Sequence, residues 1–384
     1  MSGADRTDQT DGTMNHSVID TKTLGQANNR YGPTAARRVS TEPIRLKTTT
    51  VDCHAHVMVP EAAAYIGAHG DMTALPFLKF STPLTRETNV RQDQDRRVAM
   101  TDPADRLRVL DAQQIDMQVV APAPNQSYYE APKEHAAKVS RMVNEGVAAF
   151  VAHEPKRLSG LGTIPLQDPP AALAEFEHVM KNLGFKGVQL LTNVNGAELS
   201  SPEFEPVWAK AVELDAIVML HPMGFTEPRR LADFYFTNTI GNPLDTTLAV
   251  HHLIFSGVLE RHPALKIYAI HGGGYAAAYS GRMDHAWGAR RDANAGLPKP
   301  PTSYLRKMYF DTTVFTPHQL EYLVRTFGAD HIVLGTDWPY DMAEYYPIDH
   351  VVGTSLGEAD KAAVAGGTAI ELFGLVALTH RGGS

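Results

Sequence analysis

Cysteine, long apolar runs and N-terminal positive charge are all scarce in this 384-residue sequence, and each scarcity excludes a class of protein. Cys53 is the single cysteine, so no internal disulfide can form. No apolar run approaches the roughly 18 residues that a membrane-spanning helix needs. The acidic N-terminus also differs from a secretory signal, which begins with positive charge. These absences predict a cytoplasmic protein that does not enter a membrane.

An excess of positive charge is absent as well. The 35 lysines and arginines are outnumbered by 43 aspartates and glutamates, which gives a formal charge of −8. Proteins that bind nucleic acid without sequence preference neutralise phosphates with basic side chains, and no basic stripe is visible here. We therefore expect no nucleic-acid partner. The 43% hydrophobic and 20% charged residues are typical of a folded globular protein.

The chain divides into a polar N-terminal segment and a long patterned region. Residues 1–46 are rich in Thr, Asp, Asn, Gly and Arg, and we expect an extended, mobile arm that a neighbouring subunit could order. In residues 47–384, short apolar runs alternate with longer helical segments, which is typical of βα units. The length suffices for one (β/α)8 TIM barrel, which needs roughly 250 residues. The predicted barrel strands are Thr50–His54, Ile115–Ala121, Leu158–Ile164, Gly187–Leu191, Ile217–His221, Ile267–His271, Met308–Thr312 and Ile332–Asp337.

The segments between these strands are rich in Ala, Leu, Glu and Lys at helical spacing. The predicted helices are Lys133–Ala152, Pro170–Leu183, Pro202–Leu214, Leu244–Arg261, Pro317–Thr326 and a terminal helix at Ala359–Phe373. The stretch Pro60–Ala99 is too long for a simple loop. An insertion after the first strand of a barrel lies over the active-site mouth, so we assign residues 60–99 to substrate binding.

Two histidines at the end of the first predicted strand are the first chemical signal. Asp52, His54 and His56 are spaced two apart, so a regular strand points all three to one side and Cys53 to the other. Two neutral imidazoles from one strand can bind the same zinc ion, each at about 2.0–2.1 Å. The alternative is a pair of polar side chains that water satisfies.

Three further polar residues follow other predicted strands: His221, His271 and Asp337. They lie at the strand ends where barrel enzymes carry their active sites, so with the histidine pair they predict a metal centre. A catalytic site uses three or four protein ligands and keeps one position open. We assign His54, His56, His221 and Asp337 as ligands of one divalent metal, with Zn²⁺ preferred and Mn²⁺ as the alternative. His271 remains beside the metal to move protons, or acts as a weak fifth ligand.

Four other features have simpler explanations. A second metal would need a bridging lysine at the end of the fourth strand, but Lys186 precedes that strand, and Gln189 within it is expected to make a core polar contact. Gly272–Gly274 resemble a phosphate-binding loop, but close backbone packing beneath the site is the simpler explanation, and we expect no nucleotide there. Arg282 follows two to three helical turns later and could bind a carboxylate, its alternative being a surface salt bridge.

Four motifs together resemble the amidohydrolase superfamily, and within it the branch of 2-amino-3-carboxymuconate-6-semialdehyde decarboxylase. The motifs are Val51-Asp52-Cys53-His54-Ala55-His56, His221-Pro222, His271-Gly272-Gly273-Gly274 and Leu334-Gly335-Thr336-Asp337-Trp338-Pro339. Shorter segments at 256–261, 281–284 and 309–312 also resemble that branch. The resemblance spans residues 49 to 375 and implies the barrel fold, the same four zinc ligands and His271 as the catalytic histidine.

The resemblance also implies how substrate is held. Arg282 matches an arginine that holds the substrate carboxylate across a dimer interface, which implies a homodimer or a higher homo-oligomer. A second substrate-binding arginine is expected before the second βα unit, where Arg91 is assigned and Arg96 and Arg97 compete with it. Trp338, next to Asp337, is a further expected substrate contact.

The implied activity is non-oxidative decarboxylation of an unsaturated or aromatic carboxylic acid, as in aromatic compound catabolism. A metal would orient substrate oxygens and activate water, His271 and Asp337 would manage protons, and no organic cofactor is needed. A lactone or amide hydrolase, or a hydratase, would use the same residues, because the pocket and not the fold decides the reaction. A non-enzymatic metal-binding protein is a third alternative.

Overall fold

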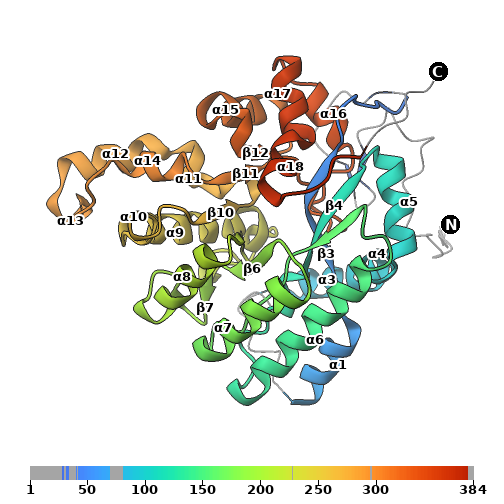
Figure 1. Cartoon of the computed structure of the whole chain (residues 1–384), viewed down its shortest axis with the longest axis horizontal. Coiled ribbons are helices and arrows are strands. Elements are labelled where there is room, and N and C mark those ends of the chain that lie inside the picture. The colour runs from blue at the N-terminus through green and yellow to red at the C-terminus, as the bar shows by residue number, and fades with distance from the viewer. Residues whose placement is uncertain are drawn as a thin grey trace, which may run out of the picture.

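The computed structural model describes residue 40 and residues 42–69, 81–226, 228–294 and 296–378, together with the backbone of two short paired strands, β1 (Asn28–Asn29) and β2 (Gly32–Pro33). The predicted N-terminal arm therefore lies almost entirely outside the described residues. Within the described part, parallel strands occupy the centre and helices surround them (Figure 1). This arrangement confirms the predicted α/β class.

Two parallel sheets form the centre of the molecule. The first has the order β3 (Val51–Val57), β4 (Met117–Pro122), β5 (Leu158–Gly160). The second has the order β6 (Gly187–Leu191), β9 (Ile217–His221), β10 (Lys266–Ala269), β11 (Tyr309–Asp311), β12 (Ile332–Val333). A separate antiparallel hairpin pairs β7 (Asn193–Val194) with β8 (Ala197–Glu198). Every strand of the two parallel sheets overlaps a predicted strand.

The edges of the two sheets approach each other at two places. Beyond β5, Gly162 forms a parallel bridge to Val188 of β6. On the other side, Ala55 of β3 bridges Trp338 in the segment after β12, and the His56 amide donates a hydrogen bond of 2.8 Å to the Trp338 carbonyl. The beginning and the end of the patterned region therefore lie side by side.

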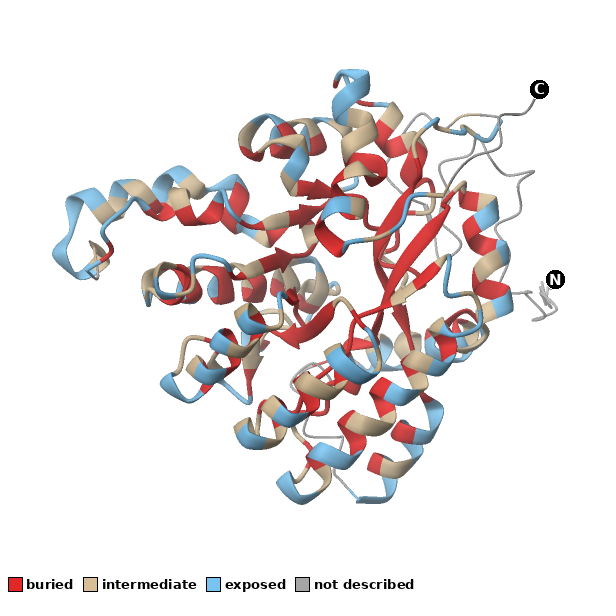
Figure 2. Cartoon of the chain, in the orientation of Figure 1, coloured by how far each residue is buried: buried red, intermediate tan, exposed pale blue. Residues whose placement is uncertain are grey.

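The helices cover the strands and keep one face buried (Figure 2). Helix α6 illustrates the reason: its buried residues include Ala136, Val139, Val143 and Val147, at the three-to-four spacing of one helical face. The α-helices are α1 (Pro60–His69), α3 (Pro83–Asp95), α4 (Arg97–Thr101), α5 (Pro103–Gln113), α6 (Lys133–Val151), α7 (Pro169–Glu177), α8 (Glu205–Glu213), α9 (Asn242–Phe255), α10 (Val258–Arg261), α11 (Gly274–Ala278), α12 (Ser280–Ala289), α13 (Arg291–Asn294), α14 (Pro301–Leu305), α15 (Pro317–Phe327), α16 (Pro347–Val352), α17 (Glu358–Ala362) and α18 (Thr368–Phe373). No helix of the described residues combines the length and the apolar character that crossing a bilayer requires.

Three predicted helices are interrupted. Gly257 adopts a left-handed φ of 77° and ends α9, so the predicted helix Leu244–Arg261 becomes α9 and α10. π-Helical turns lie in the other two, η4 (His178–Asn182) after α7 and η10 (Ala363–Gly367) between α17 and α18. Helical periodicity alone cannot separate a π turn from the α-helix around it.

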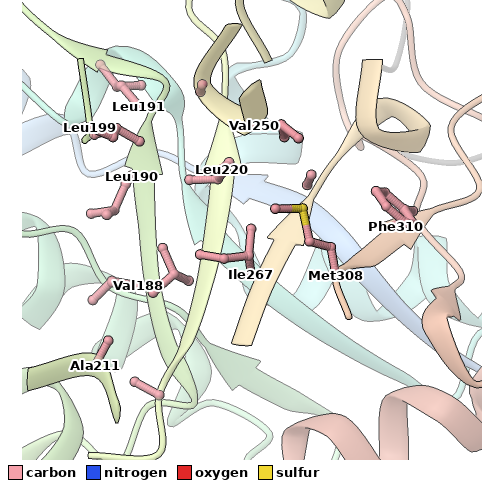
Figure 3. Close-up of a cluster of buried hydrophobic side chains, with 14 of the residues drawn as sticks. Val188, Leu190, Leu191, Leu199, Ala211, Leu220, Val250, Ile267, Met308 and Phe310 are labelled. Atoms are coloured by element: carbon pink, nitrogen blue, oxygen red, sulfur yellow. The ribbon is translucent and has the colours of Figure 1, made fainter. Parts of the chain in front are cut away.

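Apolar side chains bury both faces of the strands. Val188 of β6, Leu220 of β9 and Ile267 of β10 belong to one buried cluster with Val250 of α9 (Figure 3). Alternate positions of β9 and β10, such as Met219 and Tyr268, belong to a second buried cluster. Strands buried on both faces are typical of parallel sheets covered by helices, and each fully buried aliphatic side chain contributes about 1.5–3 kcal/mol.

One glycine shows how closely η10 packs on the start of β3. A Cβ atom added at Gly366 would lie 1.9 Å from the Thr49 carbonyl oxygen, whereas one added at Gly367 would meet nothing closer than 3.5 Å. We expect Gly366→Ala to lower the free energy of unfolding by about 1–3 kcal/mol, because backbone must move to make room. Gly367→Ala is the matched control, and denaturant unfolding is the measurement. Equal losses in the two variants would contradict this account.

Candidate metal centre

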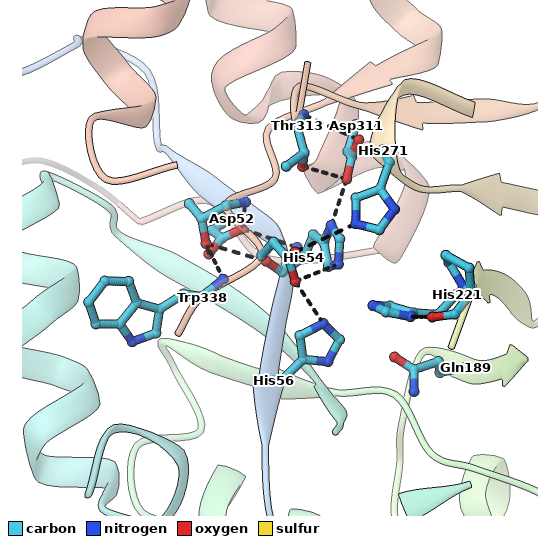
Figure 4. Close-up of polar contacts among 12 residues, drawn as sticks. Asp52, His54, His56, Gln189, His221, His271, Asp311, Thr313 and Trp338 are labelled. Atoms are coloured by element: carbon cyan, nitrogen blue, oxygen red, sulfur yellow. Dashed lines mark hydrogen bonds and ion pairs between the residues drawn. The ribbon is translucent and has the colours of Figure 1, made fainter. Parts of the chain in front are cut away.

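Three histidines and one aspartate converge at the C-terminal ends of the parallel strands (Figure 4). His54 and His56 lie on β3, His221 ends β9, and Asp337 lies in the loop after β12. One nitrogen or oxygen atom from each side chain lies within 4.8 Å of the others, and all four side chains are buried. Asp337 Oδ1 is 3.4 Å from His54 Nε2 and 3.3 Å from His56 Nε2. The structure thus brings together the four residues that the sequence suggested as ligands.

The hydrogen bonds of the three imidazoles leave one nitrogen free on each ring. His54 Nδ1 lies 2.6 Å from Asp311 Oδ2, His56 Nδ1 lies 3.1 Å from the Pro122 carbonyl, and His221 Nδ1 lies 2.6 Å from the Pro222 carbonyl. Carboxylate and carbonyl oxygens only accept, so each Nδ1 carries the proton and each Nε2 keeps its lone pair.

The free atoms face one another. Among the described residues, the Nε2 atoms of His54, His56 and His221 and the Oδ1 atom of Asp337 are buried without a hydrogen-bond partner. Buried polar atoms that lack partners are rare and costly, so four of them within one cluster need an explanation. Three imidazole nitrogens and one carboxylate oxygen are ligands that zinc and other divalent transition metals accept. The donor set therefore fits one divalent cation.

Burial and neighbouring charges shift the pKa values of the clustered histidines in different directions. Burial, together with the neighbouring imidazoles, holds the pKa of His221 well below its ordinary value. Burial alone would also lower the pKa of His54, but the nearby Asp337 and Asp311 carboxylates outweigh it and raise that pKa. Burial would raise the pKa of Asp337, yet the surrounding imidazoles hold it well below its ordinary value. Asp337 is therefore a carboxylate, and its negative charge offers a place for a cation.

Strand β3 is irregular where it carries these residues. Asp52 pairs with Gln118 of β4, whereas Ala55 pairs with Val120, so β3 contains one more residue than β4 between the two pairs. This β-bulge reverses the alternation of side chains along the strand. The prediction that Asp52 points to the same side as His56 is therefore wrong.

Asp52 instead belongs to a buried network behind the strand. Its carboxylate accepts hydrogen bonds of 2.7 Å from Gln118 Nε2 and from Thr336 Oγ1. Arg106 of α5 donates to Gln118 Oε1 at 2.8 Å, and its Nη2 donates to the carbonyls of His56 at 2.6 Å and Ala99 at 2.7 Å. Burial lowers the pKa of this arginine to about 10. The network holds α4 and α5 against the strand that carries the two histidines.

His271 lies beside the cluster. Its Nε2 is 3.5 Å from Asp337 Oδ2, and its side chain is 17% exposed, whereas the side chains of His54 and His56 are fully buried. His271 has a left-handed φ of 54° and Asp337 one of 60°, which non-glycine residues adopt mainly where the surrounding structure imposes it. The partly exposed imidazole of His271 is therefore more accessible to an entering molecule than the rings of His54 and His56.

Asp311 is a residue of the site that the sequence analysis did not select. It ends β11, is fully buried, and bonds to His54 Nδ1 and to the Gly272 amide. Burial alone would raise its pKa, but the hydrogen bond and charge of His54 outweigh burial and lower it. An available signal was its position: like Asp337, it is an acidic residue at the end of a predicted strand.

Arg96 forms part of the wall next to the cluster. Its guanidinium carbon lies 4.7 Å from the centre of the Tyr340 ring, and that ring is 5.2 Å from the ring of His56. Its Nη2 pairs with Asp93 Oδ1 at 2.5 Å, while its Nη1 is buried and has no hydrogen-bond partner among the described residues. A buried N–H group without a partner is available to an anion.

The other predicted substrate contacts lie elsewhere. Arg91 on α3 and Arg97 on α4 are exposed. Arg282 is exposed on α12, within the helices α11–α14 that project away from the sheets (Figure 1). The Trp338 indole points away from the histidines and packs in a buried cluster with Ala55 and neighbouring side chains (Figure 4), so the structure gives it a packing role.

The remaining polar features match their simpler explanations. Lys186 precedes β6, and its Nζ contacts the Gly374 carbonyl, so this lysine does not point to the cluster. Gln189 donates to the Pro122 carbonyl at 3.0 Å, the same oxygen that accepts from His56. A Cβ at any position in Gly272–Gly274 would lie 2.3–2.6 Å from a neighbouring atom, which confirms close backbone packing there.

Parallel α/β architecture with a histidine and aspartate cluster at the strand ends defines a class of candidate metal-dependent enzymes. Residues 51–375 match the family model described as amidohydrolase. The chain belongs to this family, as its motifs predicted.

Similarity to individual proteins indicates the branch of the family. The chain is 32% identical over 276 residues to 2-amino-3-carboxymuconate-6-semialdehyde decarboxylase of Dictyostelium discoideum, covering 71% of this chain and 77% of that protein. Its fold is similar to 5-carboxyvanillate decarboxylase of Sphingomonas paucimobilis, with a TM-score of 0.77, 24% identity and coverage of 86% and 100%. It is also similar to a dihydroxybenzoic acid decarboxylase of Polaromonas sp. with bound manganese and the inhibitor 2-nitroresorcinol, with a TM-score of 0.73, 24% identity and coverage of 85% and 97%. The predicted branch is confirmed.

Proposed function

We propose that this protein is a metal-dependent, non-oxidative decarboxylase of an unsaturated or aromatic carboxylic acid. The observation that carries the proposal is the convergence of three free imidazole nitrogens and one carboxylate oxygen beside an accessible His271. The decarboxylases named above, one of which holds manganese, support the reaction type. Zn²⁺ is the preferred metal because three histidines and an aspartate suit it, and Mn²⁺ is the alternative.

We further propose that the eight parallel strands form one closed (β/α)8 barrel within residues 47–384. The bridges Gly162–Val188 and Ala55–Trp338, one at each edge between the two sheets, support closure. The insertion of residues 60–99 would cover the mouth of this barrel. The contact of Arg96 with Tyr340 supports that placement, because it brings the insertion next to the cluster.

The proposed ligands are His54, His56, His221 and Asp337, and a metal bound there supplies positive charge that polarises substrate oxygens. Arg96 binds a substrate carboxylate through its buried N–H groups. His271 donates a proton from its ring to the carbon that bears the departing carboxylate. The bond from that carbon to the carboxylate then breaks, its electron pair stays with the carbon skeleton, and carbon dioxide leaves. Asp337 Oδ2, 3.5 Å from His271 Nε2, orients the imidazole.

A lactone or amide hydrolase remains the second candidate, because it would use the same polar residues. The test is a screen of hydroxybenzoates and carboxymuconate-type acids by ultraviolet absorbance and carbon dioxide release, on protein whose metal content has been measured. We expect loss of substrate absorbance with one carbon dioxide per molecule consumed. Lactone opening without carbon dioxide would overturn the decarboxylase proposal.

Arg96 is proposed to bind substrate in preference to Arg91, which the sequence suggested first. We expect Arg96→Met to raise KM by about 10- to 100-fold with a smaller effect on kcat, because hydrogen bonds to a charged group contribute about 1.5–3 kcal/mol. Arg91→Met and Arg97→Met are matched controls, since both arginines are exposed nearby. A normal KM for Arg96→Met, or a raised KM for Arg91→Met, would contradict the assignment.

Arg282 is proposed to serve a second copy of the chain. Its exposure on projecting helices supports a role between subunits. We therefore propose a homodimer or a larger homo-oligomer in which Arg282 of one subunit faces the substrate of another.

A further inference from the structure

Asp311 joins two parts of the site that are otherwise separate in the sequence (Figure 4). Its Oδ2 atom bonds to His54 Nδ1 at 2.6 Å and to Thr313 Oγ1 at 2.7 Å. Its Oδ1 atom bonds to the Gly272 amide at 2.8 Å and to the Thr313 amide at 3.2 Å. The carboxylate is fully buried and both of its oxygens are used.

The Oδ2 atom determines the tautomer of His54. A carboxylate oxygen only accepts, so the imidazole proton must lie on Nδ1 and the lone pair on Nε2. That Nε2 is buried without a hydrogen-bond partner among the described residues and lies 3.4 Å from Asp337 Oδ1. The bond to Asp311 therefore keeps His54 in the one neutral form that can bind a cation at the cluster.

The Oδ1 atom holds the turn that carries His271. His271 and Gly272 both have left-handed backbones, with φ of 54° and 61°. A left-handed histidine costs about 1–2 kcal/mol, so the turn needs stabilising contacts. The hydrogen bond from the Gly272 amide to Asp311 is such a contact, at the residue next to His271.

We propose that Asp311 is a positioning residue with two separable roles: Oδ2 keeps His54 ready to bind the metal, and Oδ1 holds the turn that presents His271. The effect on turnover rests on the proposed function. The effects on metal affinity and on the turn do not.

Asparagine at position 311 separates the two roles. Its amide oxygen must face the Gly272 and Thr313 N–H groups, so its NH₂ group must face His54 Nδ1. That NH₂ group donates, which moves the His54 proton to Nε2 and removes the lone pair from the cluster. We expect Asp311→Asn to weaken Zn²⁺ binding by about 100-fold or more. Mutation of a residue that hydrogen-bonds to a metal ligand usually weakens metal binding by about 10- to 100-fold. The Gly272 amide should keep wild-type hydrogen exchange.

Alanine at the same position should give the opposite pattern. Asp311→Ala leaves His54 free to adopt either tautomer, so Zn²⁺ binding should weaken only by about 10-fold. The Gly272 amide loses its acceptor and should exchange faster, and kcat at saturating metal should fall at least about 10-fold. Thr313→Val is the matched control: it removes one hydrogen bond to Asp311 and should leave metal affinity and Gly272 exchange near wild type.

The measurements are Zn²⁺ affinity by chelator competition, the visible spectrum of the Co²⁺-loaded protein, and hydrogen exchange of the segment containing Gly272. Zn²⁺ binding within threefold of wild type in Asp311→Asn, or weaker binding in Asp311→Ala than in Asp311→Asn, would overturn the first role. Unchanged Gly272 exchange in Asp311→Ala would overturn the second. If the alanine variant does not fold, Asp311→Ser takes its place. A wild-type protein that binds Zn²⁺ but releases no carbon dioxide would remove the proposed reaction and leave both roles testable.

Discussion

Alanine in place of His271 is expected to lower kcat by about 10²- to 10⁴-fold while the protein keeps one bound metal ion per chain. The loss is the usual contribution of a side chain that transfers a proton in the rate-determining step. The metal is retained because His271 lies outside the group of four mutually close ligand atoms. Steady-state kinetics and metal analysis of the same preparation measure both effects.

Chemical rescue is a further test of this prediction. Added imidazole should restore part of the rate of His271→Ala, since the missing group is a proton carrier and its 17% exposed position opens to solvent. His331→Ala is the matched control, because this histidine bonds to the Met308 carbonyl away from the cluster. Full turnover in His271→Ala would remove His271 from the mechanism, and loss of metal would make it a ligand.

Alanine in place of His221 is expected to weaken metal binding by on the order of 10³-fold and to abolish turnover at ordinary metal concentrations. Four-ligand zinc sites bind with about 10–16 kcal/mol, so one ligand accounts for several kcal/mol. His221 reaches the cluster from β9, on the opposite side from β3, and among the described residues it is the one histidine outside β3 in the group of four mutually close ligand atoms. Titration with Zn²⁺ or Mn²⁺ in the presence of a competing chelator measures the change.

Chelation of the wild-type protein provides the second arm of this experiment. Removing the metal should abolish turnover, and adding back one equivalent of Zn²⁺ or Mn²⁺ should restore it, with the better metal identifying the native preference. The same treatment should not restore His221→Ala at one equivalent. Wild-type turnover after complete removal of metal would contradict metal dependence altogether.

The sequence predicted the parallel strands well because their signal is local. Two of the predicted runs, Gly187–Leu191 and Ile217–His221, match β6 and β9 at both ends. Apolar runs with turn residues on either side are sufficient for such strands, because burial on both faces makes them continuously hydrophobic. The polar residues that end several of these strands, such as His221, could then be assigned to the same end of the sheets.

The local sequence could not decide which of the three arginines lies next to the cluster. Arg91, Arg96 and Arg97 are close in the sequence and chemically identical, and helical spacing does not say which one the fold buries. Arg96 ends α3 and lies over Tyr340, a residue from the far end of the chain. That contact exists only because β3 and the segment after β12 lie side by side.

His54 and His56 illustrate which features of the site are encoded locally in the sequence and which depend on tertiary packing. Their identity, their spacing and the histidine and aspartate at other strand ends could be read from the sequence, because residue chemistry and strand-end position are local properties. The bulge that turns Asp52 away and the partnership of His54 with Asp311 depend on how β3 pairs with β4 and on where β11 ends. Those choices were decided by packing between segments that are distant in the sequence, and no local pattern encodes that packing.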